Sequence, residues 1–153
     1  MPTPYEHTQR SSFLFLVNCI VALVPIALLV TGMLARTPPQ VQLTLLAVTV
    51  LSLGLAFAFS SLTVAVRDGQ FSWWFGPGVI KRTVPLSTIA AVEPATTTVW
   101  NGWGVHLTAR GWLYNIAGRK AVLVTLRDGK RFLVGTDEPE RLTKAIATGT
   151  SLR

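Results

Sequence analysis

The chain has 153 residues, of which 50% are hydrophobic and 14% are charged, and its formal net charge is +7. This balance excludes a disordered segment and is unusual for a soluble domain, in which about 25% of residues are charged. Arg36 is the only charged residue between Phe13 and Leu62, whereas twelve Lys and Arg stand against six Asp and Glu from Thr63 onward. The composition therefore predicts an apolar first half and a basic second half.

The first half predicts a transmembrane helical hairpin. Residues 1–11 are expected to form an N-terminal tail, and the hairpin to occupy residues 12–62, with spans at 13–35 and 41–62 that contain no charged residue. About 20 apolar residues in a helix cross a hydrocarbon core roughly 30 Å thick. The short, Pro-rich link between the spans makes the helices antiparallel neighbours. A cleaved signal peptide is disfavoured because the first apolar run exceeds the usual length and a second span follows at once.

The distribution of Lys and Arg predicts the orientation. The loop between the spans has only Arg36, whereas Arg10, Arg67 and the basic second half adjoin the other ends of the spans. Lys and Arg are enriched on the cytoplasmic side of membrane proteins. We therefore expect a multi-pass protein of the cell membrane with both termini in the cytoplasm. This topology also accounts for the basic charge, so no nucleic-acid partner is expected.

The second half predicts short strands joined by tight turns. Asp68-Gly69 separates the apolar runs 62–66 and 70–75, and Asp128-Gly129 separates two more, at 121–126 and 131–134. Asp-Gly favours a two-residue type I′ turn, because both central residues of that turn need a positive φ. Three further strands are expected at 79–84, 104–109 and 113–116.

A helix is expected to end this domain. Asp137 precedes Glu140 by three residues, Pro139 stands in the first turn, and apolar residues follow at helical spacing. Gly149 is expected to close the helix. The predicted boundaries are 63–148 for the domain and 149–153 for a C-terminal tail.

These patterns resemble a known family. The Asp68-Gly69 turn, the segment 84–93 and the stretch 128–142 are similar to the bacterial pleckstrin-homology-like (PH-like) domain of small membrane proteins, over residues 62–147. The resemblance implies an α+β membrane protein in which the hairpin precedes a small antiparallel β-barrel with a C-terminal helix. Domains of this kind bind lipids, peptides or proteins, so the resemblance implies binding and does not select a ligand.

The residues that catalysis or metal binding would need are scarce. The chain has two histidines, His7 and His106, and one cysteine, Cys19, which lies in the first span. We therefore expect no catalytic residues, no cofactor and no metal site, and hence no enzyme.

Six residues are candidates for contact with an anionic surface or a protein partner. Arg127, Lys130 and Arg131 belong to the second Asp-Gly hairpin, where a two-residue turn would set Arg127 opposite Lys130. Lys81 and Arg82 could add to the same positive field. Trp74 is the sixth candidate, because Trp73 and Trp74 are neighbours on a strand and point to opposite faces, so that at most one of them fills the core. The alternative for the basic cluster is a solvated loop tip.

The sequence therefore predicts a non-catalytic, membrane-anchored interaction module that binds a protein partner or anionic lipid headgroups. The alternative is an accessory subunit of a transporter or channel, with the hairpin in a helical assembly. The alternative is disfavoured because a solute path normally needs ionisable residues inside the spans.

Overall fold

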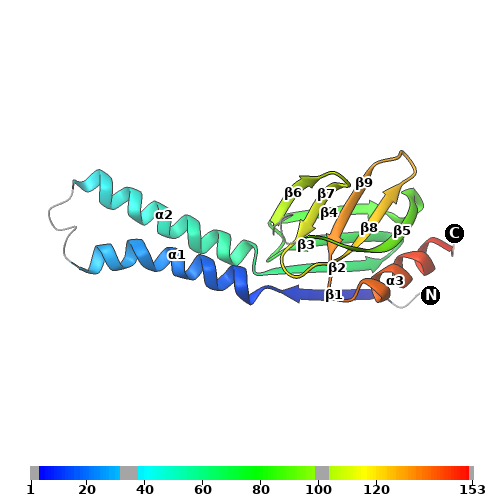
Figure 1. Cartoon of the computed structure of the whole chain (residues 1–153), viewed down its shortest axis with the longest axis horizontal. Helices are drawn as coiled ribbons and strands as arrows, with labels where there is room; N and C mark the ends of the chain where they lie inside the picture. The colour runs from blue at the N-terminus through cyan, green and yellow to red at the C-terminus, as the bar shows by residue number, and fades with distance from the viewer. Residues whose placement is uncertain (1–3, 32–37, 99–103, 152–153) are drawn as a thin grey trace.

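The computed structural model describes residues 4–31, 38–98 and 104–151, in which three α-helices and two β-sheets give the expected α+β class. Helices α1 (Ser12–Val30) and α2 (Pro39–Ala58) lie side by side and project from a β-rich domain (Figure 1). Helix α3 (Pro139–Ser151) lies at the other end of the molecule (Figure 1).

The two projecting helices differ in apolar length. Among the described residues, α2 is the one helix that is long and apolar enough to cross a membrane, and the apolar part of α1, Phe15–Leu28, is shorter. Both helices leave large apolar side chains exposed, for example Leu23 on α1 and Leu43 on α2. Residues 32–37, which include the end of the predicted first span and Arg36, lie outside the described residues.

The domain consists of two sheets. The four-stranded sheet has the order β1-β2-β3-β4, all antiparallel, with bounds Tyr5–Arg10, Ser61–Arg67, Gln70–Phe75 and Ile80–Pro85. The five-stranded sheet has the order β5-β8-β9-β7-β6, with bounds Ile89–Thr96 (β5), Lys120–Leu126 (β8), Arg131–Gly135 (β9), Gly111–Asn115 (β7) and Gly104–Thr108 (β6). Its strands cross those of the first sheet steeply (Figure 1).

The prediction of an antiparallel β-barrel is corrected to two sheets that face each other without closing, and in the second sheet β7 and β9 pair in parallel. The 3₁₀ turn η2 (Leu86–Thr88) passes the chain from β4 to β5, where the second sheet begins. The core lies between the sheets, where Trp73 of β3 stacks on Phe132 of β9 with ring centroids 4.9 Å apart. Leu142 and Ile146 of α3 complete this core. The sequence could not distinguish the two architectures. Alternating apolar residues show only that a strand buries one face, and this is true both in a barrel and in a pair of packed sheets.

The prediction of an N-terminal tail is also wrong, because residues 5–10 form the edge strand β1. Strand β1 pairs with β2 from Tyr5 opposite Val66 to Arg10 opposite Ser61. Its sequence, YEHTQR, has no aliphatic alternation, because the inward positions are Tyr5, His7 and Gln9, whose polar groups make hydrogen bonds. Gln9, for example, donates from Nε2 to the Ala117 carbonyl oxygen at 3.3 Å.

The two Asp-Gly turns differ. Asp68 and Gly69 have φ values of 53° and 72°, and Arg67 pairs with Gln70, so the first turn has the predicted geometry. In the second, the Leu126 amide donates to the Lys130 carbonyl oxygen at 2.8 Å, which leaves three residues in the turn. Arg127 therefore lies inside the turn and does not face Lys130 across the hairpin.

Helix α3 and strand β5 also depart from the prediction. The helix passes through Gly149 and continues to Ser151, where a C-terminal tail was expected. A β-carbon at Gly149 would approach Leu86 Cδ1 to 2.5 Å, so this glycine serves close packing inside the helix. Strand β5 was not predicted, because its exposed and irregular pattern, with a register shift between Ile89 and Ala91, hides the alternation.

Candidate interaction surfaces

The strand register of the four-stranded sheet shows how far each of its residues lies, along the strands, from the ends of α1 and α2 that adjoin the sheet. Strand β1 ends at the level where β2 begins, because Arg10 pairs with Ser61 and the Ser11 amide donates to the Ser60 carbonyl oxygen at 3.0 Å. The β3–β4 turn lies at this level too, since a β-carbon on Gly76 would meet the backbone oxygens of Phe57 and Ala58 at the end of α2. We name this the helix end of the domain. The far end is the level of Arg67, opposite Gln70.

Trp74 and Lys81 lie near the helix end. Thr63 lies two residues along β2 from Ser61. It pairs with Trp74 of β3, which in turn pairs with Lys81 of β4. At about 3.3 Å per residue, this row is about 7 Å from the start of the sheet. Lys81 Nζ lies 5.6 Å from the centroid of the Trp74 ring, within the range of a cation–π contact.

The two neighbouring tryptophans point to opposite faces, as the sequence predicts. Trp73 is 2% exposed and fills the core, whereas Trp74 is partly exposed on the outer face of the sheet. Arg82 pairs with Trp73 and is exposed on the edge strand β4, one residue farther from the helices than Lys81. Trp74 and Lys81 therefore share the outer face, whereas Arg82 starts from the opposite face of the same edge strand.

Arg127, Lys130 and Arg131 lie elsewhere, at the far end. Arg127 Nε donates to the Ser87 carbonyl oxygen at 2.8 Å, and its amide donates to the Thr88 carbonyl oxygen at 2.9 Å. These acceptors follow the end of β4, and Pro85 there pairs with Gln70, at the far end. Figure 1 shows the β8–β9 turn well away from α1 and α2. The six candidate residues therefore form two separate groups.

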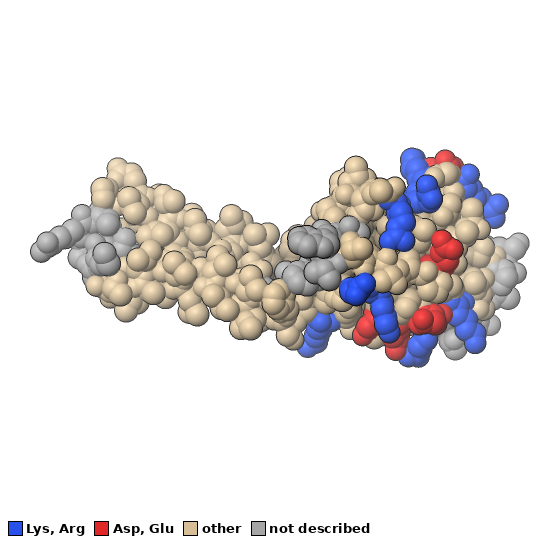
Figure 2. Space-filling model, in the orientation of Figure 1, with Lys and Arg blue, Asp and Glu red and all other residues tan. Residues whose placement is uncertain are grey.

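The far-end group is partly neutralised by its own turn. Lys130 Nζ lies 2.9 Å from Asp128 Oδ2. The hydrogen bond from the Lys130 side chain is the main reason that the pKa of Asp128 is lowered, and the same bond raises the pKa of Lys130. Arg131 is exposed next to this pair. Figure 2 shows the basic residues spread over the domain, while the visible face of α1 and α2 carries none among its described residues.

A polar cluster that the sequence did not predict joins β1 to the start of α3. His7 Nε2 lies 2.6 Å from Asp137 Oδ1, and His7 Nδ1 lies 3.5 Å from Glu138 Oε2. The Tyr5 hydroxyl donates to Glu138 Oε2 at 3.4 Å. Burial, and then the charge of Glu138, raise the pKa of Tyr5 from 10.0 to about 12. No local pattern could reveal a cluster whose members are 130 residues apart along the chain.

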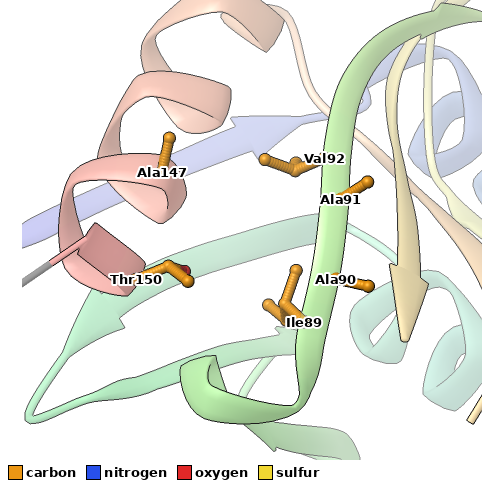
Figure 3. Close-up of a pocket in the computed structure, with 6 residues that line it drawn as sticks. All are labelled: Ile89, Ala90, Ala91, Val92, Ala147 and Thr150. Atoms are coloured by element: carbon orange, nitrogen blue, oxygen red, sulfur yellow. The ribbon is translucent and has the colours of Figure 1, made fainter. Parts of the chain in front are cut away.

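A shallow apolar cavity of about 380 Å³ lies between β5 and α3 (Figure 3). Its lining consists of small and aliphatic side chains, Ile89, Ala90, Ala91, Val92 and Ala147, together with Thr150. The one hydroxyl in this lining donates to the Ile146 carbonyl oxygen at 2.9 Å. The lining therefore offers no acid, no base and no charged group to a ligand. Within the described ranges, no three His, Cys, Asp or Glu residues are grouped to hold a metal ion.

Comparisons with known proteins found no match to a family model, to a curated protein or to a solved structure. The resemblance to PH-like domains therefore remains a prediction from the sequence.

Proposed function

We propose that this protein is a non-catalytic interaction module that helices α1 and α2 anchor in the cell membrane, with the β-domain and both termini in the cytoplasm. The observation that supports an anchor is the exposure of large apolar side chains along both helices. An exposed apolar surface of this extent normally contacts lipid or another protein. No charged residue interrupts Ser12–Val30 or Pro39–Ala58, whereas the adjoining domain is rich in charge.

The lengths of both helices suit a bilayer. Helix α1 has 19 residues and α2 has 20. At 1.5 Å per residue each is about 28–30 Å long, close to the thickness of the hydrocarbon core. Because α1 and α2 are antiparallel neighbours, we propose that both cross the bilayer as a hairpin. The basic domain and Arg10 then lie on the cytoplasmic side, as the distribution of Lys and Arg favours.

The role as an interaction module rests on the resemblance to PH-like domains, and the exposed basic groups at both ends of the domain support it. A protein partner at the far end and anionic lipid near the helix end are both compatible with these groups. The proposed module needs no chemistry of its own, because its task is to hold a ligand next to the membrane.

Membrane extraction and cysteine labelling test the proposal. We expect the full chain to stay with the membrane pellet in alkaline carbonate. With Cys19→Ser as background, Thr31→Cys at the loop end of α1 should react with an impermeant maleimide in intact cells. Lys130→Cys in the domain should react only after the cells are permeabilised. Release of the chain by carbonate would overturn the anchor, and labelling of Lys130→Cys in intact cells would overturn the orientation.

A further inference from the structure

We infer that Trp74 and Lys81 form a contact site for anionic phospholipid headgroups at the helix end of the domain. This inference rests on the proposed membrane anchor and adds to it a particular site and a ligand class. The site lies on the outer face of the four-stranded sheet, where Trp74 and Lys81 are direct cross-strand partners.

The distance of Trp74 and Lys81 from the end of α2 agrees with the thickness of the lipid headgroup layer. The polar layer on each side of a bilayer is about 5–8 Å thick, because the whole membrane measures about 40–45 Å and its hydrocarbon core about 30 Å. Trp74 and Lys81 lie about 7 Å along the sheet from Ser61, which follows α2 after two residues. A bilayer that surrounds α2 up to its end at Ala58 therefore places its headgroups beside this pair.

The chemistry of the pair suits an anionic headgroup. Tryptophan prefers the boundary between hydrocarbon and water, where its ring is in apolar surroundings and its N–H is solvated. Lys81 is exposed, and among the described residues no carboxylate lies within ion-pairing distance of it. The Trp74 ring restrains the ammonium group from one side and leaves its other sides open to a phosphate.

The far-end cations are unsuitable for the same ligand. Arg127 and Lys130 lie at the level of Gln70 and Pro85, about 20 Å along the register from the start of the sheet and therefore about 13 Å beyond the level of Trp74 and Lys81. Arg127 is bonded to Ser87, and Lys130 is paired with Asp128. These two cations should therefore contribute little to contact with the bilayer that holds the anchor.

Arg10 is at the helix end as well, but it forms a separate contact. It pairs with Ser61 on the same outer face, whereas Lys81 is on the opposite edge strand. Three strand spacings of about 4.8 Å put the two cations about 14 Å apart, too far for one headgroup to bridge them. Arg10 should therefore hold a second lipid and should not replace Lys81.

Native mass spectrometry of the full chain, released from neutral detergent, tests the site. Phosphatidylglycerol and phosphatidylcholine with identical acyl chains are titrated separately, and the dissociation constant of each bound lipid is measured. We expect Lys81→Gln to weaken phosphatidylglycerol binding about fivefold and to leave phosphatidylcholine binding unchanged. Trp74→Ala should weaken binding of both lipids, since it removes the ring as well as the restraint on Lys81.

Two controls make the test specific. Lys130→Gln removes the same charge at the far end and should change phosphatidylglycerol binding less than twofold. Glycerol phosphate, which has the headgroup charge without acyl chains, should not compete at equal concentration. Equal binding by the parent and Lys81→Gln, an equal loss in Lys130→Gln, or competition by glycerol phosphate would each overturn the site. The anchor itself is assessed separately, by retention of the same variants in alkaline carbonate pellets.

Discussion

Gly135 of β9 and Asn115 of β7 lie so close that a β-carbon on Gly135 would overlap the side-chain oxygen of Asn115. Asn115 is 1% exposed, donates to the Gly118 carbonyl oxygen at 3.3 Å and accepts from the Ala117 amide at 3.3 Å. Its side chain thereby holds the β7–β8 turn in place, and a shift of this side chain would disturb both hydrogen bonds.

Gly135→Ala should therefore lower the free energy of unfolding by about 2–3 kcal/mol, because overpacking displaces Asn115. Gly129→Ala is the matched control. Its φ of 84° disfavours alanine, but nothing lies within 4 Å of the added carbon, so the loss should be about 1 kcal/mol. Thermal unfolding of the full chain in micelles, followed by near-ultraviolet circular dichroism, measures both. A larger loss in Gly129→Ala would contradict the close packing.

Strand β1 should be needed for a stable domain. Because Ser11 and Ser60 are hydrogen-bonded neighbours, residues 12–59 can be replaced by Asn-Gly to join β1 to β2 in a two-residue hairpin. We expect this chain to be soluble and folded. A chain that starts at Ser61 should be less stable by at least about 2 kcal/mol, because it loses the backbone pairing of β1. Urea unfolding compares the two, and equal midpoints would show that β1 does not belong to the sheet.

Tyr5 should make the domain sensitive to alkali. Its pKa is raised from 10.0 to about 12 in the folded protein, so the unfolded chain ionises first as the pH rises. The stabilisation linked to Tyr5 is complete below pH 10 and is lost between about pH 10 and pH 12. Tyr5→Phe should therefore lose less stability over this interval than the parent. Thermal midpoints at several pH values test this expectation, and parallel curves for the two proteins would refute it.

Arg127 should stabilise the passage from the first sheet to the second. Its guanidinium donates to the Ser87 carbonyl oxygen in η2. Arg127→Gln should lower the free energy of unfolding by about 1 kcal/mol. Arg131→Gln removes the same charge from an exposed neighbour and should change the stability by less than about 0.5 kcal/mol. Equal losses in urea unfolding would mean that the charge matters and the hydrogen bond does not.

Several elements could be predicted because their causes are local. The type I′ turn at Asp68-Gly69 follows from two residues that tolerate a positive φ. The opposite faces of Trp73 and Trp74 follow from the geometry of any strand. The start of α3 at Pro139 follows from the capping pattern around it.

The candidate site was predictable only in part. Trp74, Lys81 and Arg82 were identified as residues, and β-sheet pairing brings Trp74 and Lys81 together while it sets Arg82 beside Trp73 on the opposite face. Their separation from Arg127 and Lys130 could not be predicted, because it depends on which end of each strand adjoins the helices. The second Asp-Gly turn shows a related limit. The same dipeptide there accommodates a third residue, Arg127, whose amide bonds to Thr88 of another element.

The sequence by itself determined the apolar and basic halves, most strands and the C-terminal helix, because burial periodicity and turn chemistry depend on near neighbours. The tertiary structure alone decided that residues 5–10 are a strand and that the sheets do not close. It also decided that Gly135 must lack a side chain and that the basic candidates lie at two levels. Each of these features depends on contacts between residues far apart in the chain, such as His7 with Asp137 or Asn115 with Gly135. Such contacts leave no periodic trace in the segments that make them.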